Sequence, residues 1–464
     1  MKIENVHIVY FLGVGGIGMS AIARWFHANG CEVYGYDKTP TALTSELIKE
    51  GIKIHFTDEV SAIPAQVKEN KETCLVIYTP AIPKDHQEHA WLKAQGYTIM
   101  KRSQVLGLIT EGSTSIAVAG THGKTTTSSM VAHVLHHGGI DCAAFLGGIA
   151  VNFNSNLVLN QQALAGSLVV VEADEFDRSF LTLHPNIAIV TAADADHLDI
   201  YGDKDALTQS FKDFIARLSS KGQLIINQRI VSQLLPNPIP QETITYGIER
   251  GDAQAQNITI VNGCFVFDFA WKDIHIQDIA LAVPGYHNVE NATAAAVSAL
   301  LSGMAPAQVK SAIGAFAGVK RRFEYIIRSP KIIFIDDYAH HPAEIEAFLK
   351  SVRALYPDKK ITALFQPHLF TRTRDFAEGF SESLSLADEV LLLDIYPARE
   401  LPIEGVNAQM LLPEITSSYK ELVSKMTALH KMERMDLEVV VTIGAGDIDQ
   451  LVQPIKNTLM KRYE

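Results

Sequence analysis

Short apolar runs recur along the chain, and a glycine turn or a polar cluster follows most of them. Runs at 6–12, 32–36 and 74–78 have the length and composition of buried strands. Residues 19–28 lie between the first two runs and repeat their apolar positions at helical spacing. Strands that alternate with helices are typical of a parallel sheet covered by helices. The pattern therefore predicts an N-terminal Rossmann-like domain over residues 1–108.

The same alternation of strand and helix returns twice further along the chain. Strands are predicted at 115–119, 168–171 and 187–191, and then at 332–335, 361–365, 389–393 and 437–443. Residues 223–282 instead show short alternating segments with a hairpin-like Asn262-Gly263, which predicts a small antiparallel β insertion. We expect an α/β protein of three domains: the N-terminal one, a central P-loop-type ATPase domain over 109–317 and a C-terminal Rossmann-like domain over 318–464.

A phosphate-binding loop is predicted where the strand at 115–119 meets the next helix. The loop reads Gly120-Thr121-His122-Gly123-Lys124-Thr125-Thr126. Backbone N–H groups at a helix N-terminus can face a phosphate, Lys124 can reach the terminal phosphates of a nucleotide, and the Thr125 hydroxyl can ligate Mg²⁺. One glycine lies three residues before Gly-Lys-Thr, whereas the common pattern needs five. The alternative is an ordinary strand-to-helix turn.

Acidic residues follow the next two predicted strands. Glu172-Ala173-Asp174-Glu175 follows the strand at 168–171, and Asp194-Ala195-Asp196-His197-Leu198-Asp199 follows the strand at 187–191. Carboxylates at the carboxyl ends of neighbouring parallel strands face the phosphate loop across the same sheet edge. The two clusters predict metal-ligating groups, with His197 among them, suited to Mg²⁺. The alternative is that these acidic residues only solvate loops.

A second glycine turn predicts a diphosphate site near the N-terminus. The first strand runs into Gly13-Val14-Gly15-Gly16-Ile17-Gly18, and the second strand ends at Asp37. Gly13, Gly15, Gly16 and Gly18 would let a diphosphate approach the following helix, while Asp37 could reach a ribose hydroxyl. The motif fits NAD, FAD or a nucleotide-sugar diphosphate, and a purely structural turn is the alternative.

Other polar clusters lie at the start of an Ala-rich helix and at strand ends of the C-terminal domain. His287-Asn288-Val289-Glu290-Asn291 could bind a base or sugar, or could equally cap the helix. In the C-terminal domain the clusters are Asp336-Asp337-Tyr338-Ala339-His340-His341-Pro342 and the run from Gln366 to Arg374. Arg322 could reach a γ-phosphate when the domains close. The pair His340-His341 has no third spaced His or Cys nearby, which disfavours zinc there.

Composition narrows the class of protein. A net charge of -12 without a long Lys/Arg cluster argues against nucleic acid as the main partner. The four cysteines are far apart with no CxxC, which indicates reduced thiols and no structural zinc. The N-terminus does not read as a signal peptide, and no apolar run approaches about 20 residues. We therefore expect a soluble cytoplasmic protein without membrane insertion.

The predicted phosphate loop and the nearby carboxylates favour phosphoryl transfer over other reactions. No GxSxG motif occurs and no cysteine stands beside a candidate base, so covalent nucleophilic catalysis is not expected. Phosphoryl transfer requires positioning and neutralisation of charge, which the phosphate loop and the carboxylates supply. An NAD-dependent oxidoreductase is a competing hypothesis, but it assigns no function to the Lys124 loop and its carboxylates. A binding protein that senses UDP-sugars and ATP without turnover is another.

Taken together, the motifs resemble those of the Mur ligases of bacterial peptidoglycan synthesis over essentially the whole chain. The most specific matches are Gly120 to Thr126, Glu172 to Glu175, Asp196 to Asp199, His287 to Asn291, Arg321-Arg322-Phe323, Asp336 to Pro342, and Gln366-Pro367-His368. The turn from Gly13 to Ser20 looks like that of the alanine-adding member. A ligase that recycles a whole tripeptide is the runner-up.

The resemblance implies an ATP-dependent ligase of cell wall biogenesis, working as a monomer or homodimer. ATP would phosphorylate the lactyl carboxylate of UDP-N-acetylmuramate, and the amine of L-alanine would attack the acyl phosphate. The resemblance also implies roles for individual residues. Lys124 would contact the phosphates, Thr125 and Glu172 would ligate one Mg²⁺, and His197 would ligate a second. Asn288 and Asn291 would bind the adenine side, Arg322 and Asp337 the nucleotide, Tyr338, His340 and Arg372 alanine or the reacting carboxylate, and Gly13 to Gly18 the UDP diphosphate.

Two departures from the family pattern affect the expected amino-acid pocket and loop. Leu369 and Phe370 stand where many relatives have Arg and Tyr, so Arg372 or Arg374 would carry more of the charge in the pocket. Ala192 stands where an Asn is common. Other Mur ligases use a carbamylated lysine beside the metals, but we interpret Lys212 as an exposed helix residue.

Overall fold

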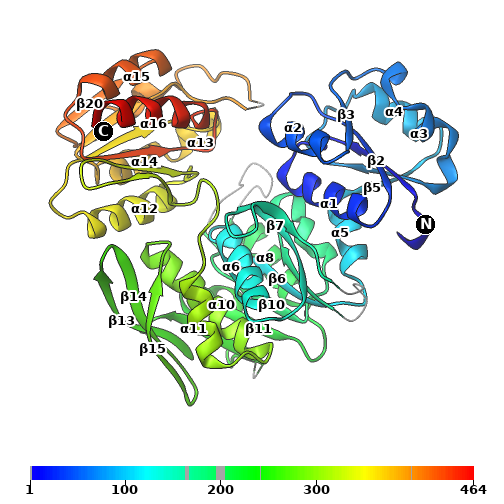
Figure 1. Cartoon of the computed structure of the whole chain (residues 1–464), viewed down its shortest axis with the longest axis horizontal. Helices are drawn as coiled ribbons and strands as arrows, with labels where there is room; N and C mark the ends of the chain where they lie inside the picture. The colour runs from blue at the N-terminus through cyan, green and yellow to red at the C-terminus, as the bar shows by residue number, and fades with distance from the viewer. Residues whose placement is uncertain (1–2, 162–166, 195–203, 241, 399, 464) are drawn as a thin grey trace. The chain divides into compact units, whose positions relative to one another are not determined.

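The computed structural model describes residues 3–161, 167–194, 204–240, 242–398 and 400–463 (Figure 1). His197, with Asp196 and Asp199, lies outside these residues, so the prediction for that cluster stays a prediction. The described residues form three sheets, and the chain divides into two compact units. The first unit contains Met1–Asn257, Phe267–Ile279 and Glu290–Phe316, and the second contains Ile258–Val266, Ala280–Val289 and Ala317–Glu464. No described helix is long and apolar enough to cross a membrane.

The N-terminal sheet is parallel throughout, as the alternation of strands and helices predicted. Its order is β3-β2-β1-β4-β5. The strands are β1 (Ile8–Leu12), β2 (Glu32–Tyr36), β3 (Lys53–His55), β4 (Cys74–Tyr78) and β5 (Thr98–Lys101). The helices are α1 (Ile17–Ala28), α2 (Ala42–Lys49), α3 (Ala65–Glu69), α4 (Gln87–Ala94) and α5 (Arg102–Thr110).

The two faces of this sheet belong to different cores because alternate strand residues point to opposite sides. Val9 and Phe11 of β1 pack in a core that continues through α1 into the central sheet, where it includes Phe145. Tyr10, between them in sequence, packs on the other face with Leu92 of α4. The face that carries α1 therefore joins the N-terminal and central sheets within one unit.

The central sheet has ten strands in the order β15-β14-β13-β12-β11-β10-β6-β9-β7-β8. Strands β6 (Thr114–Ala119), β9 (Leu168–Glu172) and β10 (Ile187–Val190) are parallel neighbours, so their carboxyl ends meet at one edge. Helix α6 (Lys124–His137) follows β6 directly. The other elements of this region are β7 (Cys142–Ala150), β8 (Ser155–Val158), α8 (Lys204–Ile215), α9 (Val231–Leu234), α10 (Tyr286–Leu301) and α11 (Pro306–Gly314).

The predicted antiparallel insertion is smaller than expected. Strands β11 (Gln223–Asn227) and β12 (Thr243–Ile248) are parallel members of the central sheet, so their assignment to the insertion is wrong. Both are buried along nearly their whole length, which is typical of parallel strands covered on two faces. What remains of the predicted insertion is β13 (Ala253–Val261), β14 (Cys264–Trp271) and β15 (Ile274–Leu281), and the start of β13 also pairs in parallel with β12. The Asn262-Gly263 turn is confirmed, with φ of 52° and 74° at its two residues.

The C-terminal sheet is again a helix-covered α/β layer, with the order β16-β17-β21-β18-β19-β20. Only β16 (Glu324–Arg328) runs antiparallel to its neighbour. The other strands are β17 (Ile333–Asp337), β18 (Ile361–Phe365), β19 (Glu389–Leu392), β20 (Tyr419–Leu422) and β21 (Val439–Ile443). The helices are α12 (Pro342–Leu355), α13 (Phe370–Asp375), α14 (Ala377–Leu384), α15 (Lys425–Arg434) and α16 (Asp449–Tyr463).

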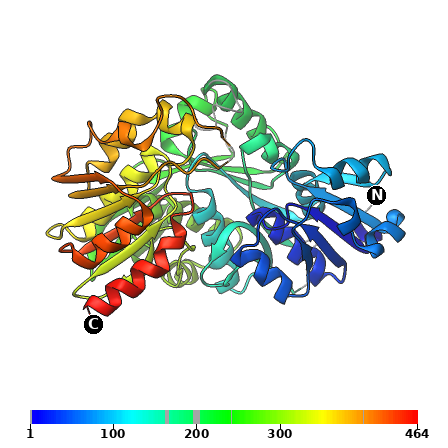
Figure 2. The ribbon, with the colours of Figure 1, turned by 90° about the horizontal axis from the view of Figure 1, so that it is seen from above.

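Both faces of the C-terminal sheet are covered. Leu459 of α16 packs in a core with Phe334 of β17, and Figure 2 shows the red C-terminal helix running along the strands. On the other face, the ring of Phe365 in β18 lies 5.5 Å from the ring of Phe380 in α14. The predicted three-part α/β fold is confirmed, while the exact domain boundaries stay a prediction.

Asn156 of β8 links the N-terminal and central sheets. The side chain is fully buried, and its amide nitrogen donates to Ser20 Oγ at 2.9 Å and to the carbonyl of Ile17. Its amide oxygen accepts from Arg24 of α1. One buried side chain therefore satisfies three polar groups of α1.

We expect Asn156→Ala to lower the midpoint of thermal unfolding, because it leaves buried polar groups of α1 without partners, at a cost of about 1–3 kcal/mol. Asn457→Ala is the matched control, since Asn457 is exposed on α16 and its amide oxygen only accepts from Gln453. The measurement is calorimetry of both variants under the same conditions. Equal midpoints for the two variants would contradict the linking role of Asn156.

Candidate active site

The phosphate loop has backbone positions that only glycine fits. Gly120 has a φ of 139°, and a Cβ there would stand 2.1 Å from Thr191 Oγ1. Gly123 has a φ of 80°, and a Cβ there would stand 2.9 Å from Asn291 Oδ1. Thr191 also donates to the carbonyls of His122 and Ala119, the latter at 3.2 Å. The loop is therefore held in a tight turn against β10 and α10.

Lys124 lies at the first position of α6 and is bound on two sides. Its ammonium donates to the carbonyl of Gly120 and to Glu175 Oε1, both at 2.7 Å. Burial lowers the pKa of Lys124, but Glu175, Asp174 and Glu172 outweigh that effect, and the pKa is raised above its ordinary value. The lysine therefore stays protonated, as a group that neutralises phosphate charge must.

Thr125 and Glu172 bring two hard oxygen donors together. Thr125 Oγ1 lies 3.1 Å from Glu172 Oε1, and the other carboxylate oxygen accepts the backbone N–H of Gly147 at 3.0 Å. Adjacent ligands of an octahedral Mg²⁺ with bonds of about 2.1 Å lie about 3 Å apart. The spacing of these two oxygens fits such an ion, and the Gly147 bond fixes the carboxylate orientation.

The carboxyl end of β10 reaches the loop through its backbone. The N–H of Thr121 donates to the carbonyl of Ala192 at 3.1 Å, and the N–H of Asp194 donates to Thr121 Oγ1 at 3.1 Å. His122 Nε2 lies 3.8 Å from Asp194 Oδ2. Because residue 192 acts here through its carbonyl, the Ala at this position leaves the Thr121 contact intact.

Thr126, which follows Thr125 at the end of the phosphate loop, is buried in the first turn of α6.

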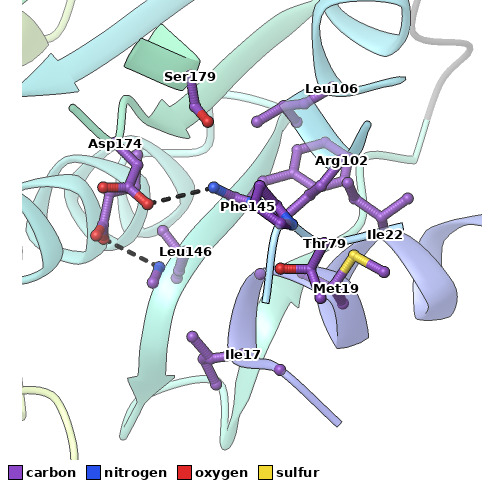
Figure 3. Close-up of a pocket in the computed structure, with 16 residues that line it drawn as sticks. Ile17, Met19, Ile22, Thr79, Arg102, Leu106, Phe145, Leu146, Asp174 and Ser179 are labelled. Carbon is purple, nitrogen blue, oxygen red and sulfur yellow. Dashed lines mark hydrogen bonds and ion pairs between the residues drawn. The ribbon is translucent and has the colours of Figure 1, made fainter. Parts of the chain in front are cut away.

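A cavity of about 230 Å³ lies beside this edge within the first unit. Elements of the N-terminal sheet contribute Thr79 and Arg102, and the central sheet contributes Phe145 and Asp174 (Figure 3). Figure 3 shows Arg102 reaching toward Asp174, and the Nη2–Oδ2 distance is 3.3 Å. The cavity is also lined by Glu172, so it connects the glycine turn to the candidate metal ligand.

The first glycine turn borders the same cavity, which Gly16 and Gly18 line. Gly13 has a φ of 89°, and a Cβ on Gly18 would stand 2.6 Å from Arg102 Nη1. Asp37 accepts the backbone N–H of Gly15 at 2.7 Å. Asp37 therefore braces the turn in this structure, and its predicted contact with a ribose stays a prediction.

The two asparagines of the Ala-rich helix have different partners. Asn291 Oδ1 accepts from Thr127 Oγ1 of α6 at 3.0 Å, and Asn288 Nδ2 donates to the carbonyl of Pro284 at 2.8 Å. Both side chains are buried. Burial and the nearby charge of Arg322 lower the pKa of His287 to about 4, which keeps that imidazole neutral. The predicted contact of the asparagines with adenine is not tested by these bonds.

Within the second unit, the end of β17 gathers the predicted nucleotide-binding residues. Asp337 is buried and accepts the backbone N–H groups of Phe323 and Ala339, at 2.7 and 2.8 Å. Burial raises the pKa of Asp337 to about 6, although Arg322 favours its charged form. The Arg322 guanidinium lies 5.1 Å from the centre of the Tyr338 ring. Arg322 and Asp337 are therefore neighbours, as the predicted cluster requires.

The predicted amino-acid pocket also gathers at one sheet edge. His340 lies beside Tyr338 and beside His368, with ring centres 5.4 and 6.0 Å apart. Arg372 is buried. Burial of the His368 ring and, to a smaller extent, the charge of Arg372 lower the pKa of His368 to about 4. Arg374, in contrast, is exposed and paired with Asp375 at 2.7 Å. Of the two arginines considered, Arg372 therefore lies with the cluster.

Leu369 has an unusual backbone for a leucine. Its φ is 70°, in the left-handed region, and it directly precedes α13. Its N–H donates to the carbonyl of Tyr396 at 2.9 Å. A non-glycine residue in this region costs about 1–3 kcal/mol, so the surrounding structure must hold the turn that presents Arg372.

Sequence reasoning missed two contributors to the first site. Glu175 was noted as part of an acidic run, but its ion pair with Lys124 was not predicted. Arg102, which begins α5 and lies beside the glycine turn, was assigned no role from the sequence. A lone arginine after a strand of a Rossmann-like sheet is the signal that could have identified it. Lys212 is exposed on α8, as predicted.

Comparison with protein families accounts for nearly the whole chain. Residues 8–114 match the model described as Mur ligase family, catalytic domain. Residues 118–299 match the Mur ligase middle domain, and residues 321–446 match the Mur ligase glutamate ligase domain. The three matches follow one another in the order of the three sheets.

Individual relatives agree with these matches. The chain is 50% identical over 461 residues to UDP-N-acetylmuramate–L-alanine ligase of Flavobacterium psychrophilum, covering 99% of each chain. It is 47% identical to the ligase of the same name from Cytophaga hutchinsonii, covering 100% of this chain and 99% of the relative. The crystal structure of UDP-N-acetylmuramate–alanine ligase from Thermotoga maritima matches with a TM-score of 0.78 and 28% identity, covering 98% of each chain. The chain belongs to the Mur ligase family.

Proposed function

We propose that this chain joins L-alanine to the lactyl carboxylate of UDP-N-acetylmuramate with cleavage of ATP to ADP and phosphate. The full-length relatives that carry this activity in their names support the proposal. The observation that carries it in the structure is the cavity between the glycine turn and Glu172. The predicted diphosphate turn borders this cavity, and so does Glu172, whose carboxylate contacts Thr125 of the predicted phosphate loop, which supports the proposal.

The reaction proceeds in two transfers. The lactyl carboxylate attacks the γ-phosphorus of ATP, the bond to the β-phosphate oxygen breaks, and ADP leaves. The amine of L-alanine then attacks the acyl carbon, and the tetrahedral intermediate loses phosphate and a proton to give the amide. Both transfers develop negative charge on oxygens, so fixed cations near those oxygens lower the barrier.

Residues of the phosphate loop hold the nucleotide in this proposal. Lys124 contacts the β- and γ-phosphates, and its bond to Glu175 keeps the ammonium near the loop. Gly120 to Thr126 present backbone N–H groups to the phosphates. Thr125 and Glu172 hold one Mg²⁺ and His197 a second; Mg²⁺ supplies neutralisation of phosphate charge. The Thr125–Glu172 spacing of 3.1 Å supports the first assignment.

The UDP-sugar occupies the cavity in this proposal. The backbone from Gly13 to Gly18 and the guanidinium of Arg102 contact the diphosphate, since Arg102 lies against Gly18. The lactyl carboxylate then points toward Glu172, which lines the same cavity. Phe145 and Leu146 exclude water from that side.

Residues of the second unit are also assigned to substrates. In this proposal Arg322 and Asp337 bind the nucleotide, as do Asn288 and Asn291, and Arg322 balances charge at the γ-phosphate. Tyr338, His340 and Arg372 orient L-alanine and the reacting carboxylate. The adjacency of Tyr338 and His340, and the buried position of Arg372, support this assignment. We place the protein in the cytoplasm, where its nucleotide substrates are made, as a monomer or homodimer.

The direct test is ADP and phosphate release from Mg²⁺-ATP with UDP-N-acetylmuramate and one acceptor at a time. We expect release with L-alanine and a product heavier by one alanyl residue. Glycine and L-serine are the informative comparisons, since one methyl group changes transition-state binding by only about 1–3 kcal/mol. Release only with the tripeptide would favour the recycling ligase, and no release with any acceptor would favour the non-catalytic sensor.

Lys124→Ala should reduce turnover by at least about 10²–10³-fold, the cost of losing one preorganised charge stabiliser. Binding of UDP-N-acetylmuramate should stay within about threefold, because Lys124 does not line the cavity. Lys212→Ala is the matched control, since Lys212 is an exposed helix lysine. Steady-state kinetics and calorimetric binding measure both effects. Loss of activity in Lys212→Ala would instead support a carbamylated lysine beside the metals.

Glu172→Gln should raise the Mg²⁺ concentration needed for half-maximal activity by at least about tenfold, because a neutral amide is a poor ligand for a hard dication. The amide still fits the space and can accept the N–H of Gly147. We expect the unfolding midpoint to change little, and activity is measured as a function of Mg²⁺. An unchanged Mg²⁺ dependence in a folded variant would remove Glu172 from the metal site.

A further inference from the structure

A second cluster of ionisable side chains is buried in the N-terminal sheet, away from the cavity. It consists of Tyr10 in β1, His55 at the end of β3, Asp58 in the following loop, His86 before α4 and Glu88 in the first turn of α4. Tyr10, His86 and Glu88 are each no more than 1% exposed. None of the five lines the cavity in the described part of the chain.

The cluster lies on the opposite face of the sheet from α1. Tyr10 packs with the core that contains Val67 of α3 and Leu92 of α4, whereas Val9 and Phe11 pack toward α1 and the central sheet. The cluster therefore shares no wall with the proposed ligase site. Its polar groups need an explanation of their own.

The donor atoms of the cluster have the spacing of metal ligands. One atom each from Asp58, His86 and Glu88 lie within 4.8 Å of one another. His86 Nδ1 is 2.9 Å from Asp58 Oδ1, and His55 Nε2 is 3.5 Å from Glu88 Oε1. Ligands of a tetrahedral ion with bonds of about 2.0–2.1 Å lie about 3.3 Å apart. The two measured pairs stand on either side of that value.

Hydrogen bonding leaves three buried polar atoms of the cluster without partners among the described residues: Glu88 Oε1, His55 Nδ1 and His86 Nε2. Tyr10 donates to Glu88 Oε2 at 2.7 Å, but Glu88 Oε1 accepts no hydrogen bond from the described residues although Glu88 is fully buried. A buried carboxylate oxygen without a partner costs about 1–3 kcal/mol or more. His55 Nε2 lies 3.5 Å from this oxygen and 2.8 Å from the Tyr10 hydroxyl, with which it shares a hydrogen bond. An ion bound by His55 through Nε2 would therefore replace the Tyr10–His55 bond, while Tyr10 keeps its bond to Glu88.

We propose that Asp58, His86 and Glu88, with His55 as the fourth ligand, form a binding site for a divalent transition metal ion, best matched by Zn²⁺. Two imidazoles and two carboxylates suit Zn²⁺, whereas Mg²⁺ prefers oxygen ligands and water. The sequence argument against structural zinc rested on the cysteines, and this donor set contains none. The side chains of His55 and Asp58 are 22% and 27% exposed, which gives the ion a path of entry.

Surrounding groups hold the ligands in place. Asp58 accepts the backbone N–H groups of Gln87 and Glu88, both at 3.1 Å, at the start of α4. Tyr10 holds the second oxygen of Glu88. Such outer contacts orient metal ligands and restrict their rotamers. The bound ion would join the loop after β3 to the start of α4, and so would stabilise the N-terminal sheet.

The test is metal binding by the full-length, tag-free protein after chelator treatment, in excess Mg²⁺ to occupy oxygen-rich sites. We expect one equivalent of Co²⁺ to bind with the intense visible absorption of a tetrahedral site, and Zn²⁺ to displace it. Zn²⁺ should also raise the unfolding midpoint of the wild-type protein. Absence of stoichiometric binding, or a spectrum of octahedral Co²⁺ only, would overturn the proposal.

Variants assign the ligands. Glu88→Gln and Asp58→Asn should each weaken Co²⁺ binding by at least about 10-fold, a loss typical of disturbed metal sites. His89→Ala is the matched control: His89 follows Glu88 on α4, but its ring packs on Tyr78, with centres 5.2 Å apart. Circular dichroism without metal checks that each variant is folded, and Asp58→Asn serves if Glu88→Gln does not fold. Unchanged binding in a folded variant would remove that residue from the site.

Discussion

The ion pair between Lys124 and Glu175 sets the charge balance on which the candidate ligase site depends. Both side chains are withdrawn from solvent, and removing either partner would take away the direct counter-charge of a buried ionised group. The chain as a whole carries a net charge of -12, so it offers polyanionic substrates no general attraction. Cations must therefore be fixed where phosphates bind. Lys124 and Arg102 meet this need, each held by a carboxylate of the same short segment after β9.

Parallel strands explain how residues distant in sequence come to share this site. Strands β10, β6 and β9 lie side by side, so the phosphate loop, Glu172 and Thr191 all emerge at one edge. The glycine turn follows β1 in the same manner in the N-terminal sheet. The continuous core around α1 then brings the two edges to one cavity. The apolar packing of α1 therefore brings the glycine turn and Glu172 to one cavity, although the packed side chains take no part in the chemistry.

The sequence predicted features that depend on local chemistry. Glycine turns, apolar runs and the polar residues at their ends were identified because each is a short contiguous signal. The parallel pairing of β11 and β12 was missed, because strand direction is decided by connections and neighbours rather than by a strand's own residues. Glu175 and Arg102 were not given roles for a similar reason. Their partners, Lys124 and Asp174, are 51 and 72 residues away, a proximity that only the fold creates.

The buried cluster around Glu88 follows the same logic on the other side of the N-terminal sheet. Tyr10 and Glu88 are separated by 78 residues, and nothing in either local segment indicates that they meet. A sheet places alternate residues of β1 in different environments, so one strand can serve an apolar junction with Val9 and Phe11 and a polar cluster with Tyr10. A metal ion that joins the loop after β3 to the start of α4 would stabilise the sheet from the face opposite this junction.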